Sequence, residues 1–209
     1  MLDNIKPYDI LFLDIETVPK VKDFHSLDVY EKELWQEKKG KHRTEEESEE
    51  DYYFNNAGIF AEFGKIICIS VGWLSQEGMF QTFELKSFYG DDEVKLLKDF
   101  SFFLRQQLAM NKNLVLCGHN IREFDVAYIC RRLLMNDLKL PDYFEGLQTK
   151  KPWEAGLLDS MDFWKFGDYK NYISLKLLAF CLGIPSPKDD ISGKDVGMVY
   201  WQQQGLERI

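Results

Sequence analysis

The feature that most constrains this chain is a pair of acidic residues after an apolar run. The run covers residues 10–13, and Asp14-Ile15-Glu16 follows it directly. Side chains alternate between the two faces of a strand, so Asp14 and Glu16 point to the same side, about 6.6 Å apart. Two carboxylates beside a hydrophobic strand are costly without a partner. A divalent cation is the favoured partner, since Mg²⁺ takes carboxylate oxygens together with substrate phosphates.

The Asp-x-Glu spacing occurs a second time, at Asp91-Asp92-Glu93. That copy follows Gly90 and opens an apolar pattern of helical period, where acidic residues suit the N-terminal end of the helix dipole. It therefore predicts the start of a helix over 91–110 and not a metal site. Only the first pair lies where a buried strand is expected to end, which is where open α/β sheets bind their ligands.

Composition favours one α/β domain over residues 1–209, because 45% of the residues are hydrophobic and 15% are aromatic. The net charge of −9 weakens a nucleic-acid role. Most of that excess falls in the acidic run 45–51, which predicts a solvated segment, and bound metal ions reverse the local field at a carboxylate site. No apolar run is long enough to span a membrane, so we expect a cytoplasmic protein without a membrane partner.

The order of the apolar segments predicts an α/β fold, a mixed sheet flanked by helices. Strands are expected at 9–14, 65–74, 79–85 and 114–117, and helices at 91–110, 123–134, 174–182 and 194–204. The second and third strands form a hairpin. The irregular stretch at about 20–62 is interpreted as an insertion on the domain, a partly mobile flap.

A second group of polar residues, Gly118 to Asp125, follows the strand at 114–117. One interpretation is structural: Asn120 caps the next helix, Glu123 closes a capping box and Asp125 is a favourable acid in the first turn. The other is functional, with Asp125 held toward the end of the first strand, and the two are compatible. His119 is interpreted as a turn residue, because the chain has no Gly-x-Ser-x-Gly nucleophile elbow.

In these motifs the chain resembles the DEDD superfamily of 3′–5′ exonucleases, which have a ribonuclease-H-like fold. Within that superfamily it resembles specifically the predicted exonucleases related to the proofreading domain of family B DNA polymerases. The first motif of that family is Asp-x-Glu, matched by Asp14 and Glu16. The second is Asn, a spacer, an aromatic residue and Asp, matched by Asn120, Phe124 and Asp125. The segment 172–184 resembles the helix that precedes the third motif.

The resemblance implies hydrolysis of phosphodiester bonds with two Mg²⁺ or Mn²⁺ ions. Asp14 would bridge both ions, Glu16 would bind the ion that activates water, and Asp125 would bind the other. The implied substrate is single-stranded DNA or a frayed 3′ end, with RNA as a further possibility. The resemblance also places Thr17 and Asn120 against the 3′-terminal nucleotide. Phe124 would pack under the terminal base, although its helical spacing favours a core position.

The chain departs from this family at the third motif, Tyr-x-x-x-Asp, which does not occur between Leu182 and Ile209. We therefore expect a truncated exonuclease that lacks the fourth carboxylate and is weak or inactive as it stands. The alternative is a non-catalytic domain of the same fold that binds nucleic acid or another protein. The sequence does not predict the oligomeric state.

Overall fold

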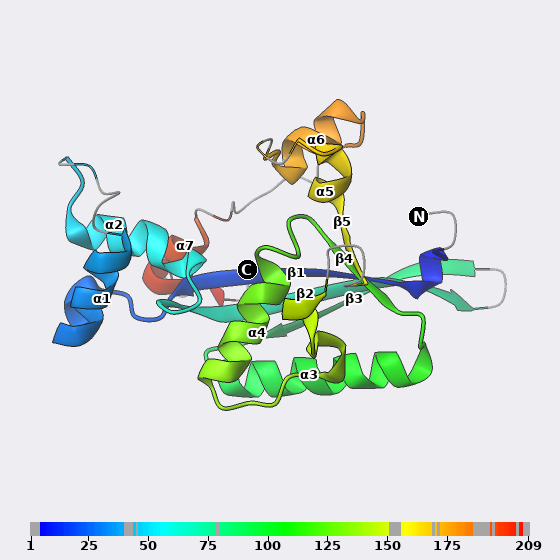
Figure 1. Ribbon diagram of the computed structural model, residues 1–209, viewed down its shortest axis with the longest axis horizontal. Coiled ribbons are helices and arrows are strands. Elements are labelled where there is room, and N and C mark those ends of the chain that lie inside the picture. The colour runs from blue at the N-terminus through cyan, green and yellow to red at the C-terminus, as the bar shows by residue number, and fades with distance from the viewer. Residues whose placement is uncertain are drawn as a thin grey trace.

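The computed structural model describes residues 5–39, 44, 46–77, 80–150, 156–168, 170, 172–185, 193, 195–203 and 205–206. Within them the centre is a five-stranded sheet with the order β3-β2-β1-β4-β5 (Figure 1). The strands are β1 (Ile10–Pro19), β2 (Gly64–Glu77), β3 (Phe80–Tyr89), β4 (Val115–Gly118) and β5 (Leu157–Asp159). β1 runs antiparallel to β2 and parallel to β4. The expected mixed sheet flanked by helices is confirmed (Figure 1).

Two helices, α3 (Glu93–Met110) and α4 (Asp125–Met135), cover one face of the sheet (Figure 1). Alternation along β1 turns Leu11, Leu13 and Ile15 toward them, and all three are buried. Leu97 of α3 and Ile129 of α4 complete this core from the helix side. The residues of β1 that alternate with these three buried residues face the other side of the sheet. Helices α3 and α4 do not cover that side.

β1 is longer than the expected strand 9–14, because it continues to Pro19. Pairing with the parallel neighbour β4 covers only Ile10 to Phe12, whereas pairing with β2 continues to Pro19 through an irregularity after Glu16. The carboxylate pair therefore lies inside a strand, at the point where one of its two neighbours ends. The prediction that the strand itself ends there is wrong.

The stretch 20–62 is not irregular where it is described. It contains α1 (Val29–Lys39) and α2 (Glu49–Asn56), which lie at one end of the sheet (Figure 1). Ser48 caps α2 by accepting the backbone N–H of Asp51 at 3.0 Å, so part of the acidic run forms the first turn of a helix. Trp35 is 2% exposed and its ring lies 5.3 Å from that of Tyr53. Aromatic side chains therefore pack α1 against α2.

The described residues after β5 include three further helices. They are α5 (Ser160–Lys165), α6 (Leu175–Cys181) and α7 (Val196–Gln203). Short 3₁₀ helices are η2 (Pro7–Asp9), η3 (Phe24–Ser26), η5 (Ala57–Ile59), η6 (Asp142–Phe144) and η7 (Leu147–Thr149). α7 packs beside the end of β1, where Trp201 donates its indole N–H to the carbonyl of Pro19 at 3.2 Å. Of the helices described, none has the length and apolar character needed to cross a membrane.

Candidate functional site

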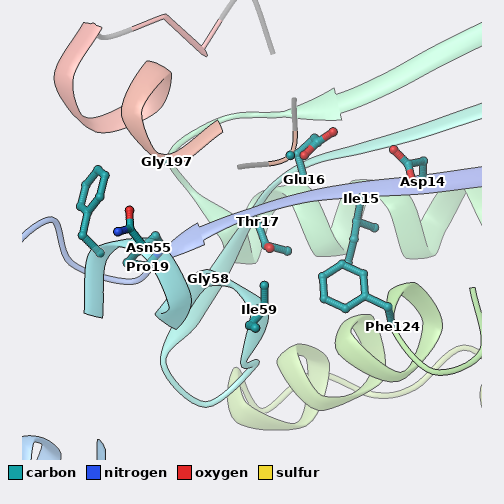
Figure 2. Close-up of a pocket in the computed structure, with 12 residues that line it drawn as sticks. Asp14, Ile15, Glu16, Thr17, Pro19, Asn55, Gly58, Ile59, Phe124 and Gly197 are labelled. Carbon is teal, nitrogen blue, oxygen red and sulfur yellow. The ribbon is translucent and has the colours of Figure 1, made fainter. Parts of the chain in front are cut away.

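Asp14 and Glu16 lie on the open side of β1, as their spacing predicts. Figure 2 shows both carboxylates on one side of the strand, with Ile15 and Phe124 on the other. Asp14 is exposed and Glu16 is half-buried. On the neighbouring strand β2, Ser70 lies opposite Asp14 and Cys68 lies opposite Glu16. The open face of the sheet therefore presents two carboxylates beside small polar side chains.

Asp125 reaches the same strand from helix α4. It is the first residue of that helix and is 3% exposed. Its Oδ1 accepts the backbone N–H of Ile15 at 3.1 Å, the residue between the two carboxylates of β1. β4 no longer pairs with β1 at this point, so the Asp125 carboxylate takes the place of a strand carbonyl. Asp125 therefore contacts the backbone of the same short segment of β1 that carries Asp14 and Glu16.

The three acids influence one another electrostatically. Burial, and secondly the charge of Asp14, raises the pKa of Glu16 to about 7. Burial and the same charge raise the pKa of Asp125 to about 7. Asp14 is exposed to solvent, yet the protein around its carboxylate removes enough hydration to raise its pKa, an effect that His119 opposes. A cation placed between these groups would lower the cost of holding them ionised.

A cavity of about 350 Å³ adjoins the carboxylates (Figure 2). Its lining residues come from β1, from α2 and η5 in the stretch 20–62, from the start of α4 and from the region of α7. They are Asp14, Ile15, Glu16, Thr17, Pro19, Phe54, Asn55, Gly58, Ile59, Phe124, Gly193 and Gly197. Residues of α2 and η5 therefore form one wall of the space beside the acidic pair.

Thr17 and Phe124 both line this cavity, on the side of β1 opposite the two carboxylates. Phe124 is half-buried against the core, and its ring lies 5.5 Å from that of Tyr128. The Tyr128 phenol donates to the carbonyl of Gly58 at 2.8 Å and lies within hydrogen-bonding reach of the Thr17 hydroxyl. Phe124 therefore occupies the core position that its helical spacing favoured, and it also lines the cavity.

The expected capping box at Asn120 is not formed. Helix α4 starts at Asp125 and Phe124 occupies the N-cap position, while Asn120 has a positive φ of 63°. The backbone N–H of Asn120 donates to Asp159 Oδ1 at 2.8 Å. Asn120 is half-buried in the turn, and neither it nor Asp125 is among the described residues that line the cavity. The capping prediction is wrong because a tight turn separates Asn120 from the helix.

Asp159 is a buried acid that the sequence patterns did not single out. It ends β5, is 3% exposed, and accepts the backbone N–H groups of Asn120, Arg122 and Met161 at 2.8, 3.2 and 3.0 Å. These bonds tie the end of β5 to the turn that carries Asp125. The signal in the sequence was the apolar pair Leu157-Leu158 before an acid, the same pattern as Leu13 before Asp14.

His119 belongs to this turn, as interpreted from the sequence. Its Nε2 donates to the carbonyl of Ile173 at 2.7 Å, and its Nδ1 lies 2.9 Å from the Ser160 hydroxyl. Ser160 Oγ also lies 3.2 Å from the Gly118 carbonyl. The imidazole therefore fixes the segment before α6 to the end of β4, and its position near Asp14 partly opposes the rise that burial causes in the pKa of that acid.

Hard carboxylate oxygens are the donors that Mg²⁺ and Mn²⁺ prefer, so Asp14, Glu16 and Asp125 suit a divalent ion chemically. Within the described part of the chain, however, no three His, Cys, Asp or Glu side chains are grouped closely enough to hold a metal ion. The Asp125 oxygen facing β1 is occupied by the Ile15 N–H. The carboxylate oxygens therefore suit a divalent ion chemically. Their positions in this structure do not form a coordination site for it.

Comparison with known proteins places the chain in a family. The sequence profile of the RNase_H superfamily matches residues 53–207, a range that leaves out β1. The structure is similar to that of the family B DNA polymerase from the hyperthermophilic archaeon Pyrobaculum calidifontis, with a TM-score of 0.53 and 15% identity. That similarity covers 95% of this chain and 22% of the polymerase. No curated protein sequence matches the chain. The chain therefore belongs to the RNase_H superfamily and has the fold of a nuclease-type domain.

Proposed function

We propose that this protein is a divalent-metal-dependent 3′–5′ exonuclease that acts on single-stranded DNA or on frayed 3′ ends. The observation that carries the proposal is the placement of three acids along one segment of β1, with Asp125 bonded to the backbone between Asp14 and Glu16. Membership of the RNase_H superfamily supports a nuclease, and the cavity beside the acids supports a bound substrate end. A cytoplasmic location stays a prediction.

In this proposal Asp14, Glu16 and Asp125 are the metal ligands. A divalent ion held by these residues would supply an activated water and would offset negative charge on the phosphate. Asp14 is the most accessible of the three acids and faces solvent on the open side of the sheet. Glu16 has to lose its proton before it can bind a cation, since its pKa is raised to about 7. Asp125 fixes the backbone between them.

The cavity suggests how the 3′ end is held. Phe124 presents an aromatic ring to it, on which a terminal base would stack. Thr17 contributes a hydroxyl beside the ring. Asn120 lies in the turn before α4, where its backbone is fixed by Asp159, and we propose that its side chain contacts the terminal nucleotide. DNA remains the preferred substrate and RNA the other possibility.

A nuclease assay tests this proposal directly. The protein, in excess over a 5′-labelled single-stranded oligonucleotide and with Mn²⁺ or Mg²⁺, should produce a ladder of products shortened from the 3′ end. A 3′-labelled substrate should release labelled mononucleotide from the first turnover. EDTA and Asp14→Asn should each remove this activity. Asp99→Asn is the matched control, since Asp99 is an acid on the exposed face of α3, paired with Lys95.

We expect slow cleavage by residues 1–209, because these residues contain no Tyr-x-x-x-Asp motif that could supply a fourth carboxylate. The same fact favours a second candidate, a non-catalytic domain that binds single-stranded nucleic acid. Binding of the labelled oligonucleotide without any metal-dependent product would support that candidate. Cleavage that is indifferent to Asp14→Asn would contradict both the ligand assignment and the exonuclease mechanism.

A further inference from the structure

Strand β3 forms an exposed edge of the sheet. It is 10 residues long and has β2 as its strand neighbour, at the end of the order β3-β2-β1-β4-β5. Every residue of β3 except Phe88 is exposed, and the exposed ones include Phe80 at 76%, Phe83 at 52% and Leu85 at 74%. Long, apolar edges of this kind readily accept another strand, and proteins usually cover them or interrupt them.

The backbone groups available for pairing belong to alternate residues. Phe80 and Glu77 close the β2–β3 hairpin, and Gly90, just past β3, donates its N–H to the carbonyl of Ile67 at 3.1 Å. Both contacts are made at even-numbered positions, and backbone groups alternate in direction along a strand. The even-numbered residues of β3 therefore direct their N–H and C=O groups toward β2. The odd-numbered positions direct theirs outward, and they are Gln81, Phe83, Leu85, Ser87 and Tyr89.

Two charged side chains flank the centre of this edge. Glu84 and Lys86 are both exposed, and they lie on the same face of the strand because they are two residues apart. When an antiparallel copy of the strand is centred on Leu85, Glu84 of each copy lies opposite Lys86 of the other. A second strand with the same charge at both positions would instead form one attractive and one repulsive pair. The edge is therefore complementary in charge to itself.

We infer that β3 is the interface of a symmetric homodimer, in which two β3 strands pair antiparallel about Leu85 and join the two sheets into one. Leu85 would meet its own copy as a hydrogen-bonded pair, with the Cα atoms about 5.5 Å apart. On the open face, Phe83 would lie opposite Ser87 and Gln81 opposite Tyr89. Glu84 and Lys86 would form two cross-strand ion pairs on the other face.

This arrangement also fixes how the two carboxylate sites are related. A two-fold axis through the paired strands is perpendicular to the sheet, so both open faces point the same way. Asp14 and Glu16 lie on that face in each copy. The dimer would therefore present both sites on one side of a continuous sheet, with the α3 helices side by side on the other. The interface makes no use of the metal ligands and does not depend on the proposed activity.

Charge-swap variants test the register. Sedimentation equilibrium of the wild type over about 1 to 100 μM should show a dimer. Glu84→Lys alone places lysines opposite each other, and Lys86→Glu alone places glutamates opposite each other, so each should be monomeric. A mixture of these two variants should form a heterodimer, and the double variant should dimerise again. Circular dichroism melting of each variant checks that it is folded.

A cysteine pair provides an independent measurement. Leu85→Cys, in a background with the exposed Cys181 changed to Ser, should form a disulfide-linked dimer under mild oxidation, since the expected Cα separation suits a disulfide. Gln81→Cys is the matched control, because its two copies would lie at opposite ends of the paired strands. A folded wild type that stays monomeric over this range, or equal cross-linking of both cysteine variants, would overturn the proposal.

Discussion

The carboxylate of Asp125 accepts a hydrogen bond of 3.1 Å from the backbone N–H of Ile15. This bond joins the first residue of α4 to the segment of β1 that carries Asp14 and Glu16. It lies where pairing with β4 has ended and β1 would otherwise have an unsatisfied buried donor. Asp125 therefore has a structural role that can be separated from its proposed role as a metal ligand.

Two substitutions at Asp125 separate these roles. Asp125→Ala leaves the Ile15 N–H without an acceptor, so the free energy of unfolding in urea should fall by about 1–3 kcal/mol. Asp125→Asn keeps an acceptor oxygen and should lose less stability, yet it removes the charge and should lose Mn²⁺ binding measured by calorimetry. Equal stability losses in both variants would show that charge, and not the hydrogen bond, is what the fold needs.

Glu16 should make stability fall as pH rises. The folded protein holds the pKa of Glu16 at about 7 against a normal value of 4.5, so it binds that proton more tightly than the unfolded chain does. The free energy of unfolding should therefore decrease between about pH 4.5 and 7 and stay low above it. Without metal at pH 8, Glu16→Gln should be more stable than the wild type by about 1–2 kcal/mol. Equal melting temperatures of both proteins at pH 8 would contradict this effect.

Mn²⁺ should stabilise the folded protein, because the three acids are ionised only at a cost that a cation offsets. At an ion concentration about 100 times the dissociation constant the gain is about 2.7 kcal/mol, visible as a higher melting temperature. The gain should be larger at pH 8 than at pH 6, since protons compete at Glu16 and Asp125. Calorimetry should give one tightly bound ion. A second tight ion would mean that a further acid completes the site.

Asp159 should be needed to hold the turn before α4. Asp159→Ala removes an acceptor from three backbone N–H groups, and we expect a loss of about 2–4 kcal/mol in the free energy of unfolding. Asp162→Ala is the control, since Asp162 is a half-buried acid of α5 that pairs with Arg122 at 2.7 Å. A loss at Asp159 no larger than that at Asp162 would show that the turn holds its shape without this carboxylate.

The buried ion pair between Glu93 and Arg132 should contribute strongly to stability. Their closest contact is 2.5 Å, and Glu93 also accepts the Ile66 N–H while Arg132 donates to the Ala61 carbonyl. Arg132→Met leaves Glu93 buried without its partner, so chemical unfolding should show a loss of about 3–5 kcal/mol.

The exposed pair formed by Lys95 and Asp99 is the matched control for that experiment, since it lies on the same helix as Glu93. Lys95→Met should change the free energy of unfolding by about 0.5 kcal/mol or less. Similar losses for Arg132→Met and Lys95→Met would indicate that burial adds nothing to the Glu93–Arg132 interaction.

The sequence alone determined the features that depend on local periodicity. Asp14 and Glu16 share one side of β1 because strand side chains alternate, and that follows from the backbone of any strand. The helices over 93–110 and 125–135 follow from apolar residues at helical spacing, which select one face for the core. The order of these segments was enough to predict a mixed sheet flanked by helices.

Only the tertiary structure decided the features that join distant parts of the chain. β1 continues to Pro19 because β2 pairs with it there, which no pattern within β1 reveals. The Asp125–Ile15 bond spans 110 residues, and the contact of Asp159 with the Asn120 turn spans 39. Asn120 satisfies the sequence rule for a helix cap but takes a left-handed conformation, since the turn and not the helix fixes its backbone. Such contacts depend on which segments the folded core brings together.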